Sequence, residues 1–310
     1  MLTGSMTRAV ADAVRWACRL DVAAAKPGNV SIASPGHGMC AEDFLASAEA
    51  IAAPLAEPGY KVGERIAAAV DATWNRVGKN TNLGIVLLAA PLAQAALAAR
   101  PQETLERATA RVLAELDRDD ATQAFRAIVQ ANPAGLGKAE RLDVHAPVQA
   151  SLQEAMQAAA HRDTIALQYA KGFSDIFQFG VPRFLAALAR HGSEERATVS
   201  CFLAWLTRFP DTHIARKQGI DVARQVSAEA ARLEAACSTG EDVAAETLLQ
   251  SWDVSLKSRG INPGTSADLT VASLLAARLQ GVCTEQFSER DALVVPVRKG
   301  TWRHGMSLHE

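Results

Sequence analysis

Apolar residues recur at intervals of three or four positions along most of the chain, which is the spacing of one face of an α-helix. In residues 41–56, for example, Phe44, Ala48, Ile51 and Leu55 fall on such a face. Pro- and Gly-containing turns separate the periodic segments. The pattern predicts helices over residues 8–25, 41–56, 62–77, 84–99, 104–116, 119–132, 146–170, 183–191, 195–208, 215–236, 243–257 and 265–280.

Only residues 292–298, ALVVPVR, read as a strand, and Pro296 weakens that interpretation because proline cannot donate to a sheet. Strands and helices therefore do not alternate, which argues against a Rossmann-type sheet. No linker or low-complexity segment divides the chain. We expect an all-α fold: a single compact multi-helix domain over residues 1–290 with buried Ala/Leu-rich central helices, then a polar C-terminal extension over residues 291–310.

Composition strengthens the helical prediction and limits the partners. The 310-residue chain is 49% hydrophobic but only 5% aromatic, and much of the excess is alanine, the strongest helix former. A net charge of −2 gives no reason to expect nucleic-acid or anionic-membrane binding. The apolar segment 84–99 contains Pro91 and is shorter than the ~20 residues that a membrane span needs, so we expect a buried core helix there.

The cysteines and the N-terminus bear on the compartment. The five cysteines are scattered without CxxC spacing, so they predict neither a zinc site nor a disulfide framework. Unpaired thiols favour a cytoplasmic location. Charged residues interrupt the apolar N-terminal segment, unlike a signal peptide, and Met1 and Met6 are both candidate start residues.

Candidate chemistry lies in polar clusters that precede apolar helices. The segment GKNTNLG places Asn80, Thr81 and Asn82 directly before the almost uncharged run 84–99. A buried helix does not require three such side chains at its start. We therefore expect them to hydrogen-bond to a ligand.

A second cluster, NPGTSAD, repeats this design and places Asp268 in the first turn of its helix. The unpaired N–H groups of a helix N-terminus, approached through small residues, bind phosphate. Asp268 could then hold the Mg²⁺ of a polyphosphate, with Asp163 or Glu42 as further candidates. The alternative interpretation is an ordinary helix cap by Thr265 or Ser266.

Two further segments add polar side chains. Residues 25–44 form a long irregular stretch that contains Lys26, Asn29 and His37. A long loop in a compact domain is usually functional, although a plain interhelix connection is the alternative. In RFPDTHIARKQG, Arg216 suits phosphate binding, whereas we interpret Lys217 as a solvated residue.

These clusters follow the order seen in one known family. Between Lys26 and Leu279 the chain carries KPGNVS, EDFLASA, NTNLGIVLLAAPLA, RDTIALQYAKGF, DTHIARKQG and NPGTSADL. In order and spacing these motifs resemble the CitG-like family, whose named members are triphosphoribosyl-dephospho-CoA synthases. The resemblance implies an all-helical transferase. In its reaction the 2′-hydroxyl of 3′-dephospho-CoA attacks the ribose anomeric carbon of ATP, adenine leaves, and the triphosphate stays on the product.

The resemblance also implies residue roles. Asp268, His37 and Asp163 would be catalytic, and Asp268 and Asp163 would bind Mg²⁺ supplied as MgATP. A carboxylate would stabilise the oxocarbenium-like charge, while other groups move protons from the acceptor and to the adenine. Substrate and phosphate binding would fall to the polar residues of the clusters: Lys26, Asn29, Asn80, Thr81, Asn82, Arg216, Asn262, Gly264, Thr265 and Ser266. The expected partners are ATP and a hydroxyl-bearing cofactor precursor, with no nucleic acid and no membrane; the composition permits a homodimer.

Three motifs depart from the family pattern. KPGNVS, GHGM and NTNLG stand where synthases read closer to KPGLVD, GAHRDM and NTHKG. The changes remove charge near the expected triphosphate, which indicates a divergent branch. Two alternatives stay open: a (phospho)ribosyl transferase of a methanopterin-type cofactor pathway in one-carbon metabolism, and a non-catalytic helical binding protein. Convergence of the polar clusters on one pocket would favour an enzyme over the binding protein.

Overall fold

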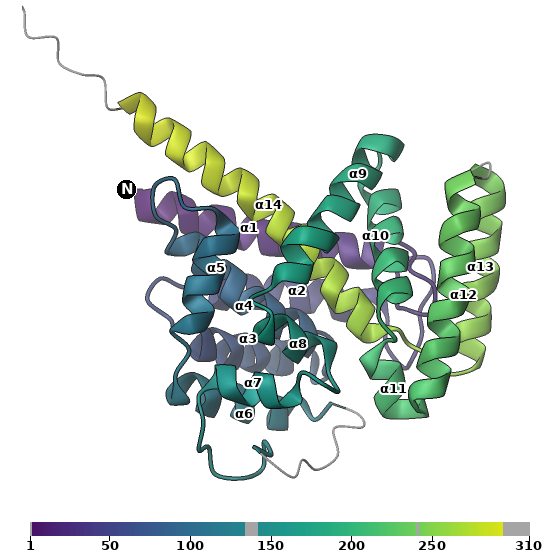
Figure 1. Ribbon diagram of the computed structural model, residues 1–310, viewed down its shortest axis with the longest axis horizontal. Coiled ribbons are helices and arrows are strands. Elements are labelled where there is room, and N and C mark those ends of the chain that lie inside the picture. The colour runs from purple at the N-terminus through teal and green to yellow at the C-terminus, as the bar shows by residue number, and fades with distance from the viewer. Residues whose placement is uncertain (1, 134–141, 240–241, 294–310) are drawn as a thin grey trace, which may run out of the picture.

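The computed structural model describes residues 2–133, 142–239 and 242–293. In these ranges the chain is a bundle of helices without a sheet (Figure 1), which confirms the all-α fold. An isolated bridge pairs Gly36 with Met39. The elements are α1 (Leu2–Ala23), α2 (Ala41–Ala56), α3 (Val62–Val77), α4 (Leu83–Leu97), α5 (Leu105–Ala114), α6 (Arg118–Ala131), α7 (Leu152–Ala159), α8 (Thr164–Ala170), the π-helical η1 (Ile176–Gly180), α9 (Val181–His191), α10 (Glu194–Arg208), α11 (Thr212–Gln218), α12 (Ile220–Thr239), α13 (Asp242–Ser258) and α14 (Gly264–Leu293).

Helix α4 forms the centre of the main core. Nearly all of its residues are buried, from Leu83 to Ala96, and it packs against α1, α2, α3, α5 and α14. A helix that is apolar on every side is stable only when it is enclosed in this way. The prediction of a buried helix in this segment is therefore confirmed, and it continues through Pro91.

Helix α14 contributes residues to both core clusters of the molecule. It packs against α1, α4, α9 and α10, and its C-terminal end extends away from the bundle (Figure 1). A second core cluster lies beside the start of α14 and joins α10, α11, α12 and α13 through residues such as Phe202, Ile214 and Leu256. The hairpin of α12 and α13 forms one edge of the fold in Figure 1.

Two predicted helices are each divided in the structure. The helix predicted over 146–170 is wrong as a single element, because Asp163 accepts hydrogen bonds from the N–H groups of Ile165 and Ala166 and so starts α8 as a new helix. The helix predicted over 215–236 is divided at Gly219, whose φ of 95° belongs to the region that favours glycine.

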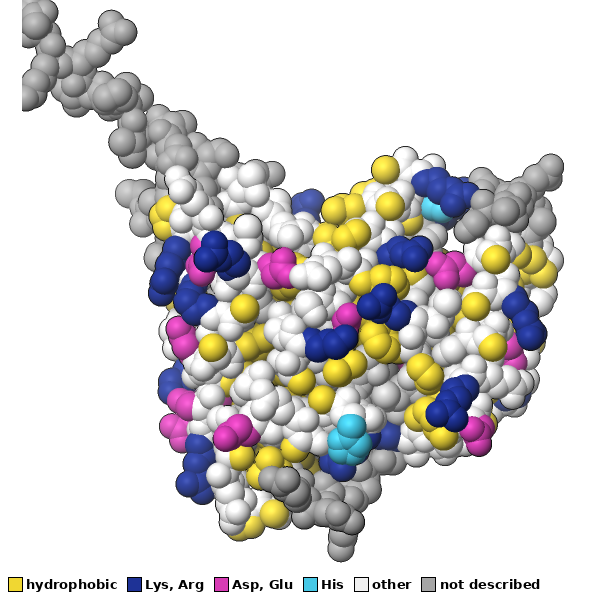
Figure 2. Space-filling view, in the orientation of Figure 1, with side chains coloured by type: hydrophobic (Ala, Val, Ile, Leu, Met, Phe, Trp, Pro, Cys, Tyr) yellow, Lys and Arg dark blue, Asp and Glu magenta, His cyan; other side chains and the backbone are white. Residues whose placement is uncertain are grey.

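The remaining fold predictions concern the ends and the surface. The strand predicted over 292–298 falls outside the described residues except for its first two positions, which end α14, and the extension 291–310 lies almost wholly outside them. Among the described helices, none is both long enough and apolar enough for a bilayer span. On the face seen in Figure 2, basic and acidic side chains are interspersed.

Candidate active site

The polar clusters converge on one cavity of about 650 Å³. Its walls come from the end of α1, the loop before α2, the start of α4, the α7–α8 region, α11 and the start of α14. It is lined by most of the residues predicted from sequence: Asn29, His37, Asn80, Thr81, Asn82, Asp163, Arg216, Asn262, Gly264 and Asp268. Lys26, Thr265 and Ser266 do not line it, and neither does the exposed Glu42.

Asp268 lies where the starts of α4 and α14 meet. Gly84 contacts it so closely that a Cβ on Gly84 would lie 2.0 Å from Asp268 Oδ2 and 2.8 Å from Ile165 Cδ1. None of the described residues donates a hydrogen bond to the Asp268 carboxylate. Burial, followed by the negative charges of Asp21 and Asp211, raises the pKa of Asp268 well above its usual value, although Arg216 opposes this shift. Such a carboxyl group is stabilised as an anion by any cation that enters the cavity.

Asp163 already has partners on both oxygens. Oδ1 caps α8, and Oδ2 accepts a hydrogen bond of 2.6 Å from Arg216 Nη1. Both side chains of this ion pair are about three-quarters buried, with 26% and 24% exposure. Asp163 therefore orients the Arg216 guanidinium in the cavity wall.

The Asn-Thr-Asn segment has internal contacts at each side chain. Asn80 Oδ1 accepts from the Leu83 N–H at 3.2 Å, and the Thr81 hydroxyl lies 2.6 Å from that of Ser47. Asn82 Oδ1 accepts from the Thr73 hydroxyl at 3.1 Å. These bonds hold the segment against α2 and α3, and they leave the buried Asn82 Nδ2 without a hydrogen-bond partner among the described residues.

Thr265 and Ser266 belong to a buried junction behind the cavity. Asp211 Oδ1 accepts from the backbone N–H groups of His213 and Ile214 and caps α11. Its Oδ2 accepts from both the backbone N–H and the hydroxyl of Ser266, at 2.7 and 2.8 Å, while Thr265 Oγ1 accepts from the His213 N–H at 3.1 Å. One carboxylate therefore joins the starts of α11 and α14. The interpretation of Thr265 or Ser266 as the cap is therefore wrong, because both lie inside the first turn of α14 and Asp211 accepts the Ser266 N–H in their place.

Lys26 also lies behind the cavity wall. It is almost completely buried, and its Nζ lies 3.0 Å from Asp21 Oδ1 and donates to the Asp21 carbonyl oxygen. Asp21 itself lines the cavity. The buried ammonium thus balances a carboxylate that faces the ligand space, which is the usual requirement for a buried charge.

Several cavity residues were missed from the sequence, and His213 is the most informative. Burial, assisted by the nearby positive charges of Arg216 and Lys217, lowers the pKa of His213 to about 4, so its ring is neutral near pH 7. Its Nε2 is buried without a hydrogen-bond partner in the described part of the chain. Arg162 and the exposed Lys217 add basic groups to the wall. The DTHIARKQG motif was the available signal for His213.

Unsatisfied polar atoms are concentrated at this cavity. Asn29 Oδ1, Asn82 Nδ2, His213 Nε2 and Arg216 Nε are all buried and have no hydrogen-bond partner among the described residues. Buried polar groups in native proteins nearly always have partners, and each one left without a partner requires an explanation. A polar ligand in the cavity would supply both donors and acceptors to this set.

Most of the remaining cavity wall is apolar. Leu87, Phe125, Ile128, Met156 and Ala159 line it from α4, α6 and α7. A ligand site with an apolar wall and a few polar groups is typical of cofactor-sized molecules. The cavity therefore suits a ligand with both a charged part and an apolar part.

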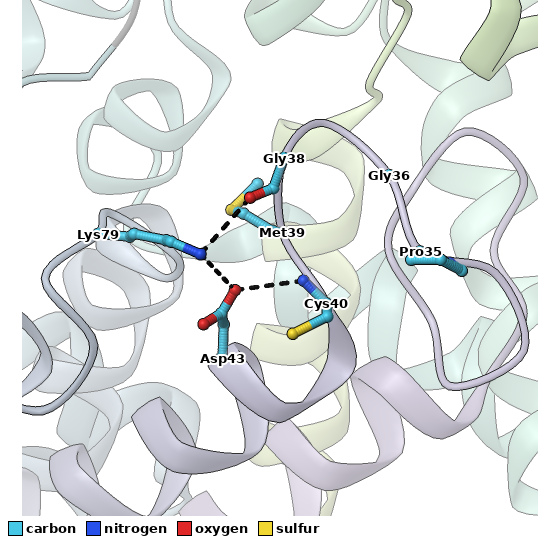
Figure 3. Close-up of a pocket in the computed structure, with 7 residues that line it drawn as sticks. All are labelled: Pro35, Gly36, Gly38, Met39, Cys40, Asp43 and Lys79. Atoms are coloured by element: carbon cyan, nitrogen blue, oxygen red, sulfur yellow. Dashed lines mark hydrogen bonds and ion pairs between the residues drawn. The ribbon is translucent and has the colours of Figure 1, made fainter.

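A smaller hollow of about 460 Å³ adjoins the cavity and shares Met39 with it. Figure 3 shows Lys79 extending across this hollow to Asp43 at 2.9 Å, and its Nζ also lies 3.5 Å from the Gly38 carbonyl oxygen. The interaction with Lys79 is the largest of several that lower the pKa of Asp43. Lys79 thereby ties the loop that carries His37 to the segment that precedes α4.

The residues fit a magnesium ion only together with a phosphorylated ligand. Among the described residues, no group of three or more His, Cys, Asp or Glu side chains could hold a metal ion. Mg²⁺ commonly uses one or two carboxylates together with substrate phosphates. Asp268 accepts no hydrogen bond from the part of the chain that the structure describes and suits that role, whereas both oxygens of Asp163 are engaged.

Over the described residues, fold and cavity define an all-helical protein with a large site that has charged groups of both signs and an apolar wall. The family described as CitG, ATP:dephospho-CoA triphosphoribosyl transferase, matches residues 7–285. The chain belongs to this family.

Individual relatives agree with this assignment. A probable 2-(5″-triphosphoribosyl)-3′-dephosphocoenzyme-A synthase from Pseudomonas fluorescens is 27% identical over 130 residues, which are 39% of this chain and 44% of that protein. A protein of the same description from Albidiferax ferrireducens is 34% identical over 108 residues, which are 35% of each chain. The matched segments thus span less than half the length of these relatives.

A solved structure shares the fold. A crystal structure described as that of a "putative triphosphoribosyl-dephospho-coA synthase" from Archaeoglobus fulgidus superimposes with a TM-score of 0.61 at 24% identity. The superposition covers 77% of this chain and 99% of that chain.

Proposed function

We propose that the protein is a transferase that joins the ribose anomeric carbon of ATP to a hydroxyl group of 3′-dephospho-CoA and releases adenine. The observation that carries this proposal is the convergence of the polar clusters on one cavity in a member of the CitG family. The alternative, a (phospho)ribosyl transferase of a methanopterin-type cofactor pathway, gains no support from the relatives. Both relatives are described as probable 2-(5″-triphosphoribosyl)-3′-dephosphocoenzyme-A synthases. Convergence on one cavity also argues against a non-catalytic binding protein.

Basic groups would bind the triphosphate. Arg216, oriented by Asp163, lines the cavity together with Lys217 and Arg162. Charged donors of this kind form the strongest hydrogen bonds to phosphate. A Mg²⁺ ion held by Asp268 and the phosphates would neutralise triphosphate charge when it is bound.

The chemical step requires charge stabilisation and two proton movements. As the bond from the anomeric carbon to adenine breaks, positive charge develops on the ribose, and a nearby carboxylate such as Asp268 stabilises it. The acceptor hydroxyl must lose a proton and the departing adenine must gain one. Among the described residues, His37 and His213 line the cavity with imidazoles that could serve these transfers.

The apolar wall suits the parts of the substrates that carry no charge. Adenine and the pantetheine arm of the acceptor both have apolar surface that would pack against Phe125, Ile128 and Met156. Burial against this wall would also exclude water from the anomeric carbon and so limit hydrolysis of ATP.

Product analysis tests the proposal. The purified protein, incubated with MgATP and 3′-dephospho-CoA, should give a product with the summed mass of the two substrates less that of adenine. A product that retains adenine, or a transfer that works only with another acceptor, would contradict the proposed substrate pair. The cytoplasmic location and the homodimer remain predictions.

A further inference from the structure

Helix α13 contacts the loop that carries Asn29, His37 and Met39 of the cavity, although α13 lies at the edge of the fold. Asp253 Oδ1 accepts a hydrogen bond of 2.7 Å from the backbone N–H of Gly28, and Oδ2 accepts one of 2.6 Å from the Ser34 hydroxyl. Lys257 Nζ lies 3.0 Å from Asp253 Oδ1 and donates to the Ser34 carbonyl oxygen at 2.9 Å. The side chains of Asp253 and Lys257 are only 15% and 14% exposed. This pair therefore holds the loop at two points.

Gly28 is the central residue of this contact. Its φ of 79° lies in the left-handed region, and a Cβ there would lie 2.8 Å from Pro263 Cδ and 2.9 Å from Leu256 Cδ1. Its N–H bonds to Asp253, and its carbonyl oxygen lies 2.9 Å from His37 Nε2. The position of Gly28 thus fixes the His37 ring.

The contact between His37 Nε2 and the Gly28 carbonyl oxygen determines the tautomer of His37. A carbonyl oxygen only accepts hydrogen bonds, so Nε2 of His37 must carry the hydrogen. In the neutral ring, Nδ1 is then the nitrogen with a free lone pair. His37 lines the cavity, and Nδ1 is the nitrogen left for a ligand.

We propose that Asp253 is a positioning residue of the active site: through Gly28 it fixes the orientation and the Nε2–H tautomer of His37, so that Nδ1 is available to accept a hydrogen bond or a proton from the substrate. A carboxylate that orients a functional histidine indirectly is a common device in enzyme sites. Lys257 and Ser34 fix the carboxylate in turn. The catalytic role of this arrangement rests on the proposed transferase function. The tautomer of His37 follows from the hydrogen bond to Gly28 and does not depend on that function.

Imidazole NMR tests the tautomer directly. A long-range ¹H–¹⁵N spectrum of the whole protein at a pH where the ring is neutral should show His37 with the hydrogen on Nε2, its signals being identified by their loss in His37→Gln. In Asp253→Ala the signals should shift towards a mixture of tautomers. Asp253→Asn keeps an oxygen that accepts from the Gly28 N–H and should retain the wild-type pattern. A wild-type ring with the hydrogen on Nδ1, or an unchanged His37 pattern in folded Asp253→Ala, would overturn the proposal.

Kinetics provide the second measurement. Asp253→Ala should lower kcat for adenine release by about 10- to 100-fold, as loss of an orienting partner typically does, with a smaller change in KM. Glu229→Ala is the matched control, because Glu229 is a carboxylate of the same α12–α13 hairpin that bonds to Trp252 and Arg259 instead of the loop. This variant should leave kcat and the His37 signals unchanged.

The outcomes separate the positioning role from the proposed function. Wild-type protein that releases no adenine would contradict the proposed function and leave the tautomer test intact. An active wild type with an equally active Asp253→Ala would contradict the positioning role alone.

Discussion

Gly84 and Asp268 are in direct contact across the starts of α4 and α14, and there is no room between them for a single additional carbon atom. A Cβ on Gly84 would lie 2.0 Å from Oδ2 and 2.5 Å from Cγ of Asp268. The small residue after the Asn-Thr-Asn segment therefore allows the acidic residue of the NPGTSAD cluster to reach the cavity. Two motifs that are far apart in sequence depend on each other through this contact.

Gly84→Ala should displace the Asp268 carboxylate and lower adenine release strongly. Overpacking of this kind costs about 1–3 kcal/mol of stability, which thermal unfolding would measure. Gly281→Ala is the control, because Gly281 is another glycine in a helix and a Cβ there meets no atom within 4 Å. That control should be neutral or slightly stabilising. Full activity in Gly84→Ala would contradict the importance of the contact.

Asp268→Asn should abolish most activity while the fold is retained or becomes more stable. Because the pKa of Asp268 is raised in the folded, ligand-free protein, its ionisation opposes folding. Wild-type stability should therefore fall, relative to Asp268→Asn, as the pH rises from the unfolded value of about 3.8 through the higher folded pKa. Melting temperatures of both proteins across this range measure the difference. Parallel pH profiles would show that Asp268 does not ionise in the way described.

His213 should make the protein less stable as the pH falls, which is opposite to the effect of Asp268, and His213→Gln should remove this dependence. The folded pKa of about 4 lies below the ordinary 6.5, so protonation favours the unfolded state. The neutral ring gives full stability above pH 6.5, and this is lost as the pH falls towards about 4, by up to about 3 kcal/mol. The variant should lack this part of the acid-induced loss, whereas His145→Gln, at an exposed histidine, should retain it. Identical acid profiles for wild type and His213→Gln would contradict the buried, neutral ring.

Arg216→Met should weaken binding of inorganic triphosphate in calorimetry. Loss of a charged hydrogen-bond donor costs about 1.5–3 kcal/mol, or roughly 10- to 100-fold in affinity. Arg126→Met is the control, because Arg126 forms a comparable ion pair with Asp71 on the exposed surface. Equal affinities for the two variants would remove Arg216 from the proposed phosphate site.

The helices could be predicted from sequence largely because their apolar faces recur with helical spacing. Periodicity could not show the division at Asp163, because an Asp in a turn and an Asp on an exposed helix face look alike until the capping hydrogen bonds are visible. The enclosed helix over 84–99 was predictable, since a segment without a polar face has to be buried.

The cavity could be predicted in part. Polar clusters before apolar helices correctly indicated Asn82, Asn262 and Asp268 as neighbours of one space. The positions of Lys26 and Ser266 depend on tertiary partners, Asp21 and Asp211, and no local pattern reveals such partners. His213 was overlooked because its low pKa arises from burial and from Arg216 and Lys217 around the assembled site.

The most direct test of the central claim is adenine release measured with and without the acceptor. With MgATP and 3′-dephospho-CoA together, the wild-type protein should release adenine in proportion to the product formed, and Asp268→Asn should not. With MgATP alone, little adenine should appear, because the anomeric carbon has no acceptor. Folded wild-type protein that releases no adenine with both substrates, or releases it equally without the acceptor, would contradict the assignment of this cavity to triphosphoribosyl transfer.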